Sequence, residues 1–392
     1  MFHSVGLESH PWTWSHISES LESFEAKIAA LKSNGFTGVH WRELYDYMAG
    51  RRDLPKDSIL LTFDDGYLDN WTYVFPILKK YDLKGTIFVN PDFVDPRLDL
   101  RPNLHDVNKG RCSIDQLCVA GFLSWAEMRE MEKSGLIDVQ SHAMTHTWYF
   151  SGPKIVDFHR PHTIAPHPWL FWNACPSRKP FYLVEDQQEF VPWGYPIFEH
   201  QKSLVCRRFF PDEKCVVELT GFVADNGGKA FFQTPDWRQA IEEVLPPDYA
   251  TSGLPGRYES DAERESRVTD ELYRSKTLIE NNLNKRAEFI CWPGGANDES
   301  VHEIARRVGY RSWTLDSRSQ LEKRNSPGED PETIRRIGTS NQIFVKDRYC
   351  GTGGAYFQVL KVLAHQGSRF HKAVLRVYQL VALARSLGRP KE

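Results

Sequence analysis

Short apolar runs alternate with helix-like segments along the first 141 residues of the chain. Three of the runs predict buried strands: 58–63, 85–90 and 136–141. The segments around them carry apolar residues at helical spacing and predict helices at 17–36, 70–84 and 124–135. The last of these begins with Ser124 and has Glu127 three residues later, which is the pattern of a capping box. Because such alternation is typical of parallel β/α units, it constrains the chain to an α/β fold.

The alternation stops over residues 147–256. This stretch is rich in Pro, Gly and aromatic residues and holds five of the 12 tryptophans: Trp148, Trp169, Trp172, Trp193 and Trp237. The regular pattern then returns, with predicted helices at 261–285 and 298–309 and predicted strands at 287–293 and 310–315. We therefore expect one large α/β unit with a long insertion, which a chain of 392 residues is long enough to form.

Composition and charge argue against several classes of protein. The net charge of −3 provides no basic field for nucleic acid. Seven cysteines, an odd number without a C-x-x-C pair, favour free thiols in a reduced compartment over a disulfide framework. The chain shows no signal-like opening and no uncharged apolar run of roughly 18 residues, the length that a membrane-spanning helix needs. We expect a cytoplasmic protein.

The stretch "TFDDGY" at 62–67 directly continues a predicted strand. In β/α barrels, active sites are built at the carboxyl ends of the strands. The adjacent carboxylates of Asp64 and Asp65 would repel each other there unless a divalent cation neutralises one of them and leaves the other to act as a base. Taken alone, the motif is also consistent with an acidic turn.

The stretch "SHAMTH" at 141–146 ends a second predicted strand. A lone H-x-x-x-H is a weak signal. Together with the earlier carboxylates, however, His142 and His146 complete a set of two histidines and one carboxylate with open coordination positions. Such a site suits hydrolysis, because a metal lowers the pKa of a bound water and polarises a carbonyl group.

The two motifs and their flanks resemble the polysaccharide deacetylases of carbohydrate esterase family 4. The flanks that carry the resemblance are "FEAKIAALKSNGF", "PILKKYDLKGTIFV" and "LSWAEMREMEKSGLIDVQ". The resemblance implies a distorted (β/α)7-type barrel formed by residues 1–146 and 257–345. It also implies removal of N-acetyl groups from sugars with a divalent metal, usually Zn²⁺. Carried over to this chain, Asp65, His142 and His146 would hold the metal, and Asp64 would be the general base.

The stretch "CWPGG" at 291–295 is similar to the family's third motif, R-x-P-x-G, but departs from it. The resemblance implies that the Gly294 N–H acts with the metal to hold the oxyanion. The arginine that steadies the base in the family is Cys291 here, which leaves the orientation of Asp64 unexplained. Three aromatic residues are expected to contact the substrate: Tyr67, Trp292 and Trp313.

A deacetylase also needs a general acid that protonates the leaving amine. Most of the family carries it in a late L-x-H motif, which His365 matches only within a predicted basic helix. The poly-N-acetylglucosamine deacetylases are permuted: their acid histidine comes before the D-D, and their third motif lacks the arginine. Because "MFHSVG" and "CWPGG" resemble that arrangement, His3 is the candidate acid. We expect it near the metal site, across from Asp64.

Two further regions are expected to bear on function. The insertion at 147–256 follows His146 directly, so we expect a lid or substrate-recognition region over the site; a self-packed subdomain is the alternative. Residues 346–392 form a basic tail, with seven basic residues and one acidic residue from position 359 onward. The tail is expected to form an amphipathic helix that either contacts an anionic membrane surface or docks on the barrel.

The sequence therefore predicts a metal-dependent deacetylase that hydrolyses the N-acetyl amide of an amino sugar in a polysaccharide or glycan intermediate. Its expected setting is surface polysaccharide biosynthesis, in the cytoplasm or at the membrane periphery. The expected partner is an N-acetylated glycan and not a nucleic acid. Two alternatives stay open: an amidohydrolase or deformylase that acts on another amide, and a catalytically weak glycan-binding protein.

Overall fold

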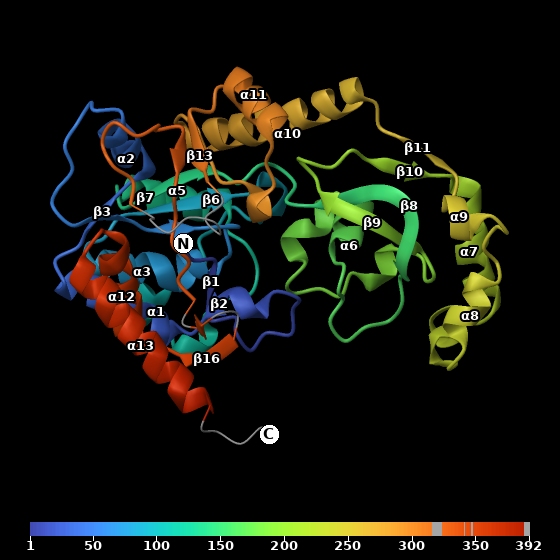
Figure 1. Ribbon diagram of the computed structural model, residues 1–392, viewed down its shortest axis with the longest axis horizontal. Helices are drawn as coiled ribbons and strands as arrows, with labels where there is room; N and C mark the ends of the chain where they lie inside the picture. The colour runs from blue at the N-terminus through green and yellow to red at the C-terminus, as the bar shows by residue number, and fades with distance from the viewer. Residues whose placement is uncertain (316–323, 341, 346–347, 388–392) are drawn as a thin grey trace.

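A curled sheet of six parallel strands lies inside the larger of the two bodies of the protein (Figure 1). The structure is a computed structural model that describes residues 1–315, 324–340, 342–345 and 348–387. In spatial order the strands are β14 (Thr333–Ile334), β13 (Ser312–Thr314), β12 (Phe289–Ile290), β7 (Ile137–Ser141), β6 (Gly85–Val89) and β5 (Thr62–Phe63). Every pairing in the sheet is parallel. The predicted distorted β/α barrel is confirmed.

The N-terminal residues occupy a further strand position beside β5. The N–H of Phe2 donates to the carbonyl of Thr62 (2.7 Å), and the carbonyl of Phe2 accepts from the N–H of Asp64 (3.0 Å). The amino group of Met1 donates to the carbonyl of Ile337, past the end of β14, over 2.9 Å. These bonds join the two edges of the sheet. Short parallel pairs accompany it: β1 (Ser4–Val5) with β2 (Ser18–Glu19), and β3 (Thr37–Val39) with β4 (Ser58–Leu60).

Helices cover the outer face of the sheet. They are α1 (Leu21–Ser33), α3 (Phe75–Tyr81), α5 (Trp125–Lys133), α10 (Asp261–Leu283) and α11 (Glu299–Val308). The predicted capping box at Ser124 and Glu127 is present at the start of α5. The predicted helix at 70–84 is shorter and begins as a π-helical turn over Asn70–Val74. Pro76 lies just inside α3, where its missing N–H is tolerated in the first turn.

Side chains on the strands alternate between the helical layer and the barrel interior. On β6, Ile87 and Val89 face the apolar core beneath the helices, whereas Phe88 faces inward. Helix α2 (Trp41–Met48) fills this interior, and its Trp41 packs edge-on against Phe88 with ring centres 5.2 Å apart. The interior is therefore a packed core, and the open space lies at the carboxyl ends of the strands.

Residues 147–256 form a lobe beside the barrel (Figure 1). Its centre is a bulged antiparallel pair, β8 (Trp148–Phe158) with β9 (Pro196–Lys202). The other elements are α6 (Trp169–Ala174), β10 (Phe209–Pro211), α7 (Glu213–Asp225), α8 (Trp237–Glu242), α9 (Tyr249–Ser252) and β11 (Gly256–Tyr258). The lobe has its own apolar cluster, which includes Phe158, Phe198, Leu219, Val223 and Ile241. A second cluster joins α6 to aromatic residues of the barrel, so the lobe both packs on itself and docks on the barrel.

The C-terminal region contains two helices with different surroundings. Helix α12 (Ala355–His365) packs on α1 and buries Val359 and Val362 in the core beneath the helices. The sequence analysis placed α12 in a tail that begins at residue 346. In the structure this helix contributes to the core of the barrel. Helix α13 (Arg369–Leu387) packs instead on the hairpin of β15 (Gln342–Val345) and β16 (Arg348–Thr352). Within the described residues, no helix combines the length and apolar character that crossing a bilayer requires. All seven cysteines are free thiols.

A buried carboxylate fixes the N-terminal segment beside the sheet. Asp69 is fully buried and accepts hydrogen bonds from the Ser4 hydroxyl (2.6 Å), the Asn70 side-chain amide (2.7 Å) and the Val5 N–H. Burial raises the pKa of Asp69 to about 7, although these hydrogen bonds oppose the rise. The network holds the chain just after His3 in place.

The raised pKa of Asp69 makes stability depend on pH. The folded protein keeps this proton up to about pH 7, whereas the unfolded chain loses it near the ordinary value of 3.8. The free energy of unfolding should therefore fall, relative to that of Asp69→Asn, as pH rises from about 4 to about 7, by up to about 1.4 kcal/mol per pKa unit. Urea unfolding of both proteins across this range measures the difference. The exposed Asp225→Asn is the control, and a constant difference between wild type and Asp69→Asn would contradict the prediction.

Candidate active site

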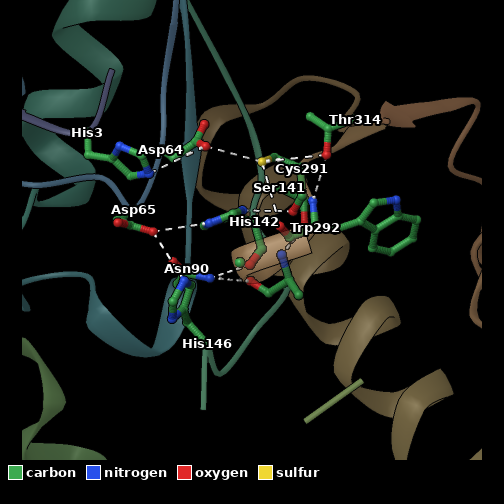
Figure 2. Close-up of polar contacts among 12 residues, drawn as sticks. His3, Asp64, Asp65, Asn90, Ser141, His142, His146, Cys291, Trp292 and Thr314 are labelled. Carbon is green, nitrogen blue, oxygen red and sulfur yellow. Dashed lines mark hydrogen bonds and ion pairs between the residues drawn. The ribbon is translucent and has the colours of Figure 1, made fainter. Parts of the chain in front are cut away.

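The carboxyl ends of β5 and β7 bring a carboxylate and two imidazoles together (Figure 2). Asp65 follows β5, His142 follows β7, and His146 lies four residues farther along the chain. Asp65 Oδ1 is 3.1 Å from His142 Nε2 and 3.3 Å from His146 Nε2. The structure thus joins the three residues that the sequence predicted as metal ligands.

The backbone at this point is bent sharply to aim the side chains. Asp65, Ala143 and His146 have positive φ values of 74°, 57° and 42°. Residues other than glycine seldom adopt this region, and such strain is typical of functional sites. The chain therefore maintains an unfavourable conformation at two of the three candidate ligands.

The donor set fits a divalent cation. Asp65 Oδ1 is buried and accepts no hydrogen bond within the described part of the chain, although two imidazole nitrogens lie close to it. His142 Nδ1 is 2.7 Å from the carbonyl oxygen of Cys291, which can only accept, so this nitrogen carries the hydrogen and Nε2 keeps its lone pair. Burial lowers the pKa of His146 to about 4, against the attraction of Asp65, which keeps this imidazole neutral as a ligand must be. Although burial lowers it, interactions with Cys291 and Asp65 raise the pKa of His142 well above its ordinary value, so a bound cation would take the place of a proton on this imidazole.

Asp64 lies next to this triad and is held by Arg336, a residue that the sequence analysis missed. The guanidinium donates to both carboxylate oxygens, over 2.7 Å and 2.9 Å, and its Nη2 lies 3.0 Å from Cys291 Sγ. Burial alone would raise the pKa of Asp64. Arg336, followed by His142, more than offsets this effect and lowers the pKa to about 2. Asp64 is therefore ionised and fixed in orientation.

His3 enters the same cavity from the N-terminal strand. Its Nε2 lies 3.9 Å from Asp64 Oδ2, so the imidazole is beside Asp64 and not across the site from it as expected (Figure 2). The side-chain amide of Asn70 donates to the carbonyl of His3 over 3.1 Å. Burial lowers the pKa of His3, although Asp65 and Asp64 act in the opposite direction. His365 lies at the end of α12 and is not among the cavity residues.

The aromatic residues predicted to contact substrate differ in where they lie. Tyr67 lines the cavity and is packed against Phe122, with ring centres 5.4 Å apart. Trp292 also borders the cavity, but its indole points away from the candidate ligands (Figure 2). Trp313 corrects the prediction, because it is buried beneath α10 and α11 and does not line the cavity. Alternation along β13 explains this: Thr314 faces the cavity, so its neighbour must face the helices.

Gly294 lies in the turn that follows β12. Its φ of 54° is in the left-handed region that favours glycine, and the residue lines the cavity. Its carbonyl accepts a hydrogen bond from Lys202, which the insertion supplies. The turn is thus placed at the cavity, where the predicted oxyanion donor should lie.

Comparison with known proteins agrees with this geometry. A family model described as polysaccharide deacetylase matches residues 51–165 and 256–313. The matched stretches contain the D-D pair, both histidines and "CWPGG". The two stretches together form a polysaccharide deacetylase domain. The gap between the two matched stretches, 166–255, lies within the lobe that interrupts the barrel.

Curated members of the polysaccharide deacetylase family match over part of the chain. The chain is 28% identical to the poly-beta-1,6-N-acetyl-D-glucosamine N-deacetylase of Escherichia coli K12 over 132 residues, which are 34% of this chain and 18% of that protein. It is 29% identical to the putative polysaccharide deacetylase YxkH of Bacillus subtilis over 131 residues, which are 32% of this chain and 47% of that protein. The chain thus spans less than half the length of either relative.

Two solved structures also align with the chain. The deacetylase domain of BpsB from Bordetella bronchiseptica has 22% identity and a TM-score of 0.45, and the alignment covers 79% of this chain and 81% of that one. The de-N-acetylase from Aggregatibacter actinomycetemcomitans has 17% identity and a TM-score of 0.48, and the alignment covers 82% and 85%.

The chain departs from the family's third motif in a way that the structure explains. Cys291 stands where the family's arginine would be, and Arg336 reaches Asp64 from the stretch after β14. Ile334 faces the barrel interior, so Arg336, two residues farther along, shares that side. Strand parity applied to "TIRRIG" could have identified it.

Replacing Arg336 by Met should lower kcat by about 10- to 100-fold, because Asp64 loses the fork that orients it. Arg336→Lys should recover part of kcat, since an ammonium keeps the charge but not the two-point contact. Steady-state kinetics below the melting temperature of each variant measures both. Arg335→Met is the matched control, because Arg335 pairs with Glu329 away from the site. An Arg336→Met variant with normal kcat and only a lower melting temperature would contradict a positioning role.

Proposed function

We propose that this protein is a divalent-metal-dependent deacetylase that hydrolyses the N-acetyl amide of an amino sugar in a polysaccharide or glycan intermediate. One observation carries the proposal. The convergent set of Asp65, His142 and His146 lies beside an ionised carboxylate, Asp64, whose orientation is fixed by Arg336. The polysaccharide deacetylase domain supports the choice of an N-acetylated sugar.

Each group in the cavity has a distinct task in this reaction. Asp65, His142 and His146 would hold a divalent cation, Zn²⁺ by preference, which would lower the pKa of a bound water and polarise the amide carbonyl. Asp64 takes the proton from the attacking water, as an ionised carboxylate can. His3 protonates the leaving amine, and the Gly294 N–H donates a hydrogen bond to the developing oxyanion. The depressed pKa of His3 makes its protonated form a stronger acid for this step.

A substrate screen tests the proposed function against its alternatives. Purified protein loaded with Zn²⁺ is incubated with N-acetylglucosamine oligosaccharides, an N-acetylated peptide and a formamide, and released acetate or formate is measured. We expect release from the amino sugars alone. Faster release from the peptide or the formamide would favour an amidohydrolase or deformylase. Sugar binding without release, at full metal occupancy, would favour a glycan-binding protein.

We also propose that α13 contacts an anionic membrane surface, where the enzyme would act in surface polysaccharide synthesis. The outward side of this helix exposes Val377, Leu380 and Val381, with exposed fractions of 59%, 60% and 44%. No Asp or Glu occurs between positions 348 and 391, so every charged side chain on this helix is basic. A second copy of the helix would bring like charges together, whereas acidic lipid complements them.

Flotation with lipid vesicles tests this contact. The protein should float with vesicles that contain phosphatidylglycerol and much less with phosphatidylcholine alone, and added salt should weaken binding. Leu380→Asp should abolish flotation, while Val217→Asp, at a similarly exposed apolar position on α7, should not. Equal flotation of wild type and Leu380→Asp would contradict the proposal, as would a dimer that Leu380→Asp dissociates.

A further inference from the structure

The cavity above the candidate metal ligands is enclosed in part by the insertion. Its volume of about 450 Å³ lies in the range of pockets that surround small ligands. The insertion contributes four of the lining residues: Trp148, Trp172, Tyr182 and Lys202. The site is therefore not built by the barrel alone.

On one side of the cavity, the insertion meets the N-terminal segment that follows β1. Trp14 stacks on Trp148, with ring centres 5.9 Å apart and planes 9° from parallel. The hydroxyl of Thr13 donates to the carbonyl of Ala165 over 2.7 Å. We call this stacked pair, Trp14 and Trp148, the aromatic wall of the cavity. It lies beside a candidate metal ligand, because the rings of Trp148 and His146 are 5.8 Å apart. Separating these aromatic surfaces would expose a large apolar area to water.

On another side, the insertion meets the turn after β12. Lys202, the last residue of β9, donates to the carbonyl of Gly294. The fit there is close, since a Cβ on Gly294 would come within 2.6 Å of Lys202 Nζ. In the sheet, β12 lies next to β7, and the N-terminal segment lies next to β5. The two contacts thus flank the strand ends that carry Asp65 and His142.

An unpaired donor on a residue that lines this enclosure points to a ligand. Trp172 is only 2% exposed and lines the cavity, and its Nε1 has no hydrogen-bond partner among the residues that the structure describes. A buried N–H without an acceptor costs free energy, so such groups are nearly always paired. The hydroxyl and carbonyl oxygens of an N-acetylated sugar are acceptors of the required kind, and the surrounding aromatic rings can pack on the apolar face of a pyranose.

From these features we propose that the cavity receives a single N-acetylated amino sugar, either free or at the end of a glycan, and not a unit inside a long chain. The inference rests on the proposed deacetylase function and deepens it. A glycan bound through an internal unit must leave the cavity in two directions. The Trp14–Trp148 stack and the Lys202–Gly294 contact obstruct such a path, whereas a terminal unit needs one exit only.

The position of the removed acetyl group tests the inference. N-acetylglucosamine oligosaccharides of increasing length, labelled at the reducing end, are treated with wild-type protein, and the free amine is located by tandem mass spectrometry. We expect one deacetylated unit at a chain terminus and a rate that does not rise with length. Deacetylation at internal units, or a rate that climbs with length, would overturn the inference and leave the proposed function intact. No acetate from any N-acetylated sugar would overturn the function itself.

Substitutions of residues that enclose the cavity provide a second test of the inference. Trp172→Phe keeps the ring but removes the donor, so KM should rise roughly two- to tenfold with little change in kcat. Trp237→Phe is the matched control, because Trp237 belongs to the insertion but does not line the cavity. Trp14→Ala opens the wall and should permit some internal deacetylation. An unchanged KM in Trp172→Phe would contradict its contact with the sugar, and the wild-type product pattern decides the main point even where a variant folds poorly.

Discussion

Asp64→Asn is expected to lower acetate release by a factor on the order of 10² to 10⁴, the usual contribution of a positioned general base. The amide of Asn keeps the size of the carboxylate but cannot take a proton from water. In wild type, the arginine fork keeps the pKa of Asp64 at about 2 despite burial, so the base is ionised throughout the neutral range. The measurement is kcat with saturating N-acetylated oligosaccharide and Zn²⁺.

Loss of folding has to be separated from loss of the base. Asp64→Asn leaves the largely buried guanidinium of Arg336 without its charge partner, which is destabilising in itself. The double variant Asp64→Asn/Arg336→Met removes both charges, so it should melt at a higher temperature than the single variant and still release almost no acetate. Recovery of activity in the double variant would show that Asp64 acts through stability and not as a base.

Replacing both imidazoles, in His142→Ala/His146→Ala, should abolish stoichiometric zinc binding and lower acetate release by about 10³-fold or more. Only Asp65 would remain of the three donors that lie within 4.8 Å of one another. Metal content after dialysis, measured by elemental analysis, gives the first readout and acetate release the second. His162→Ala, a change in the insertion away from the cavity, should retain both. Stoichiometric zinc in the double variant would refute this ligand set.

The sequence was informative where chemistry and periodicity coincide. The alternation of apolar runs and amphipathic segments predicts the parallel strands, and Ser124 with Glu127 predicts the start of α5. The D-D and H-x-x-x-H motifs follow strands whose ends must meet in a β/α barrel, so Asp65 and His142 could be placed together before the structure was known. The resemblance of "MFHSVG" to the permuted deacetylases placed His3 near the site, and the pairing of Phe2 with Phe63 brings it there, although beside Asp64 and not across from it.

Other features depend on contacts that single motifs do not encode. Arg336 reaches Asp64 from more than 270 positions away along the chain, and only the closure of the barrel makes the two neighbours. Trp313 was misassigned because a family position was carried over without strand parity, which turns its indole toward the helices. The enclosure of the cavity arises from the packing of Trp14 on Trp148, between segments that share no sequence pattern.

Titration of metal-free protein with Zn²⁺, with acetate release and bound metal measured on the same samples, tests the central claim most directly. The claim is that Asp65, His142 and His146 hold one divalent cation while Asp64 takes the proton from the attacking water. We expect acetate release from an N-acetylated oligosaccharide to rise in proportion to bound zinc and to level off at one ion per chain. Asp64→Asn should bind the same amount of zinc without comparable release. Equal release by metal-free and zinc-loaded wild type would contradict the account.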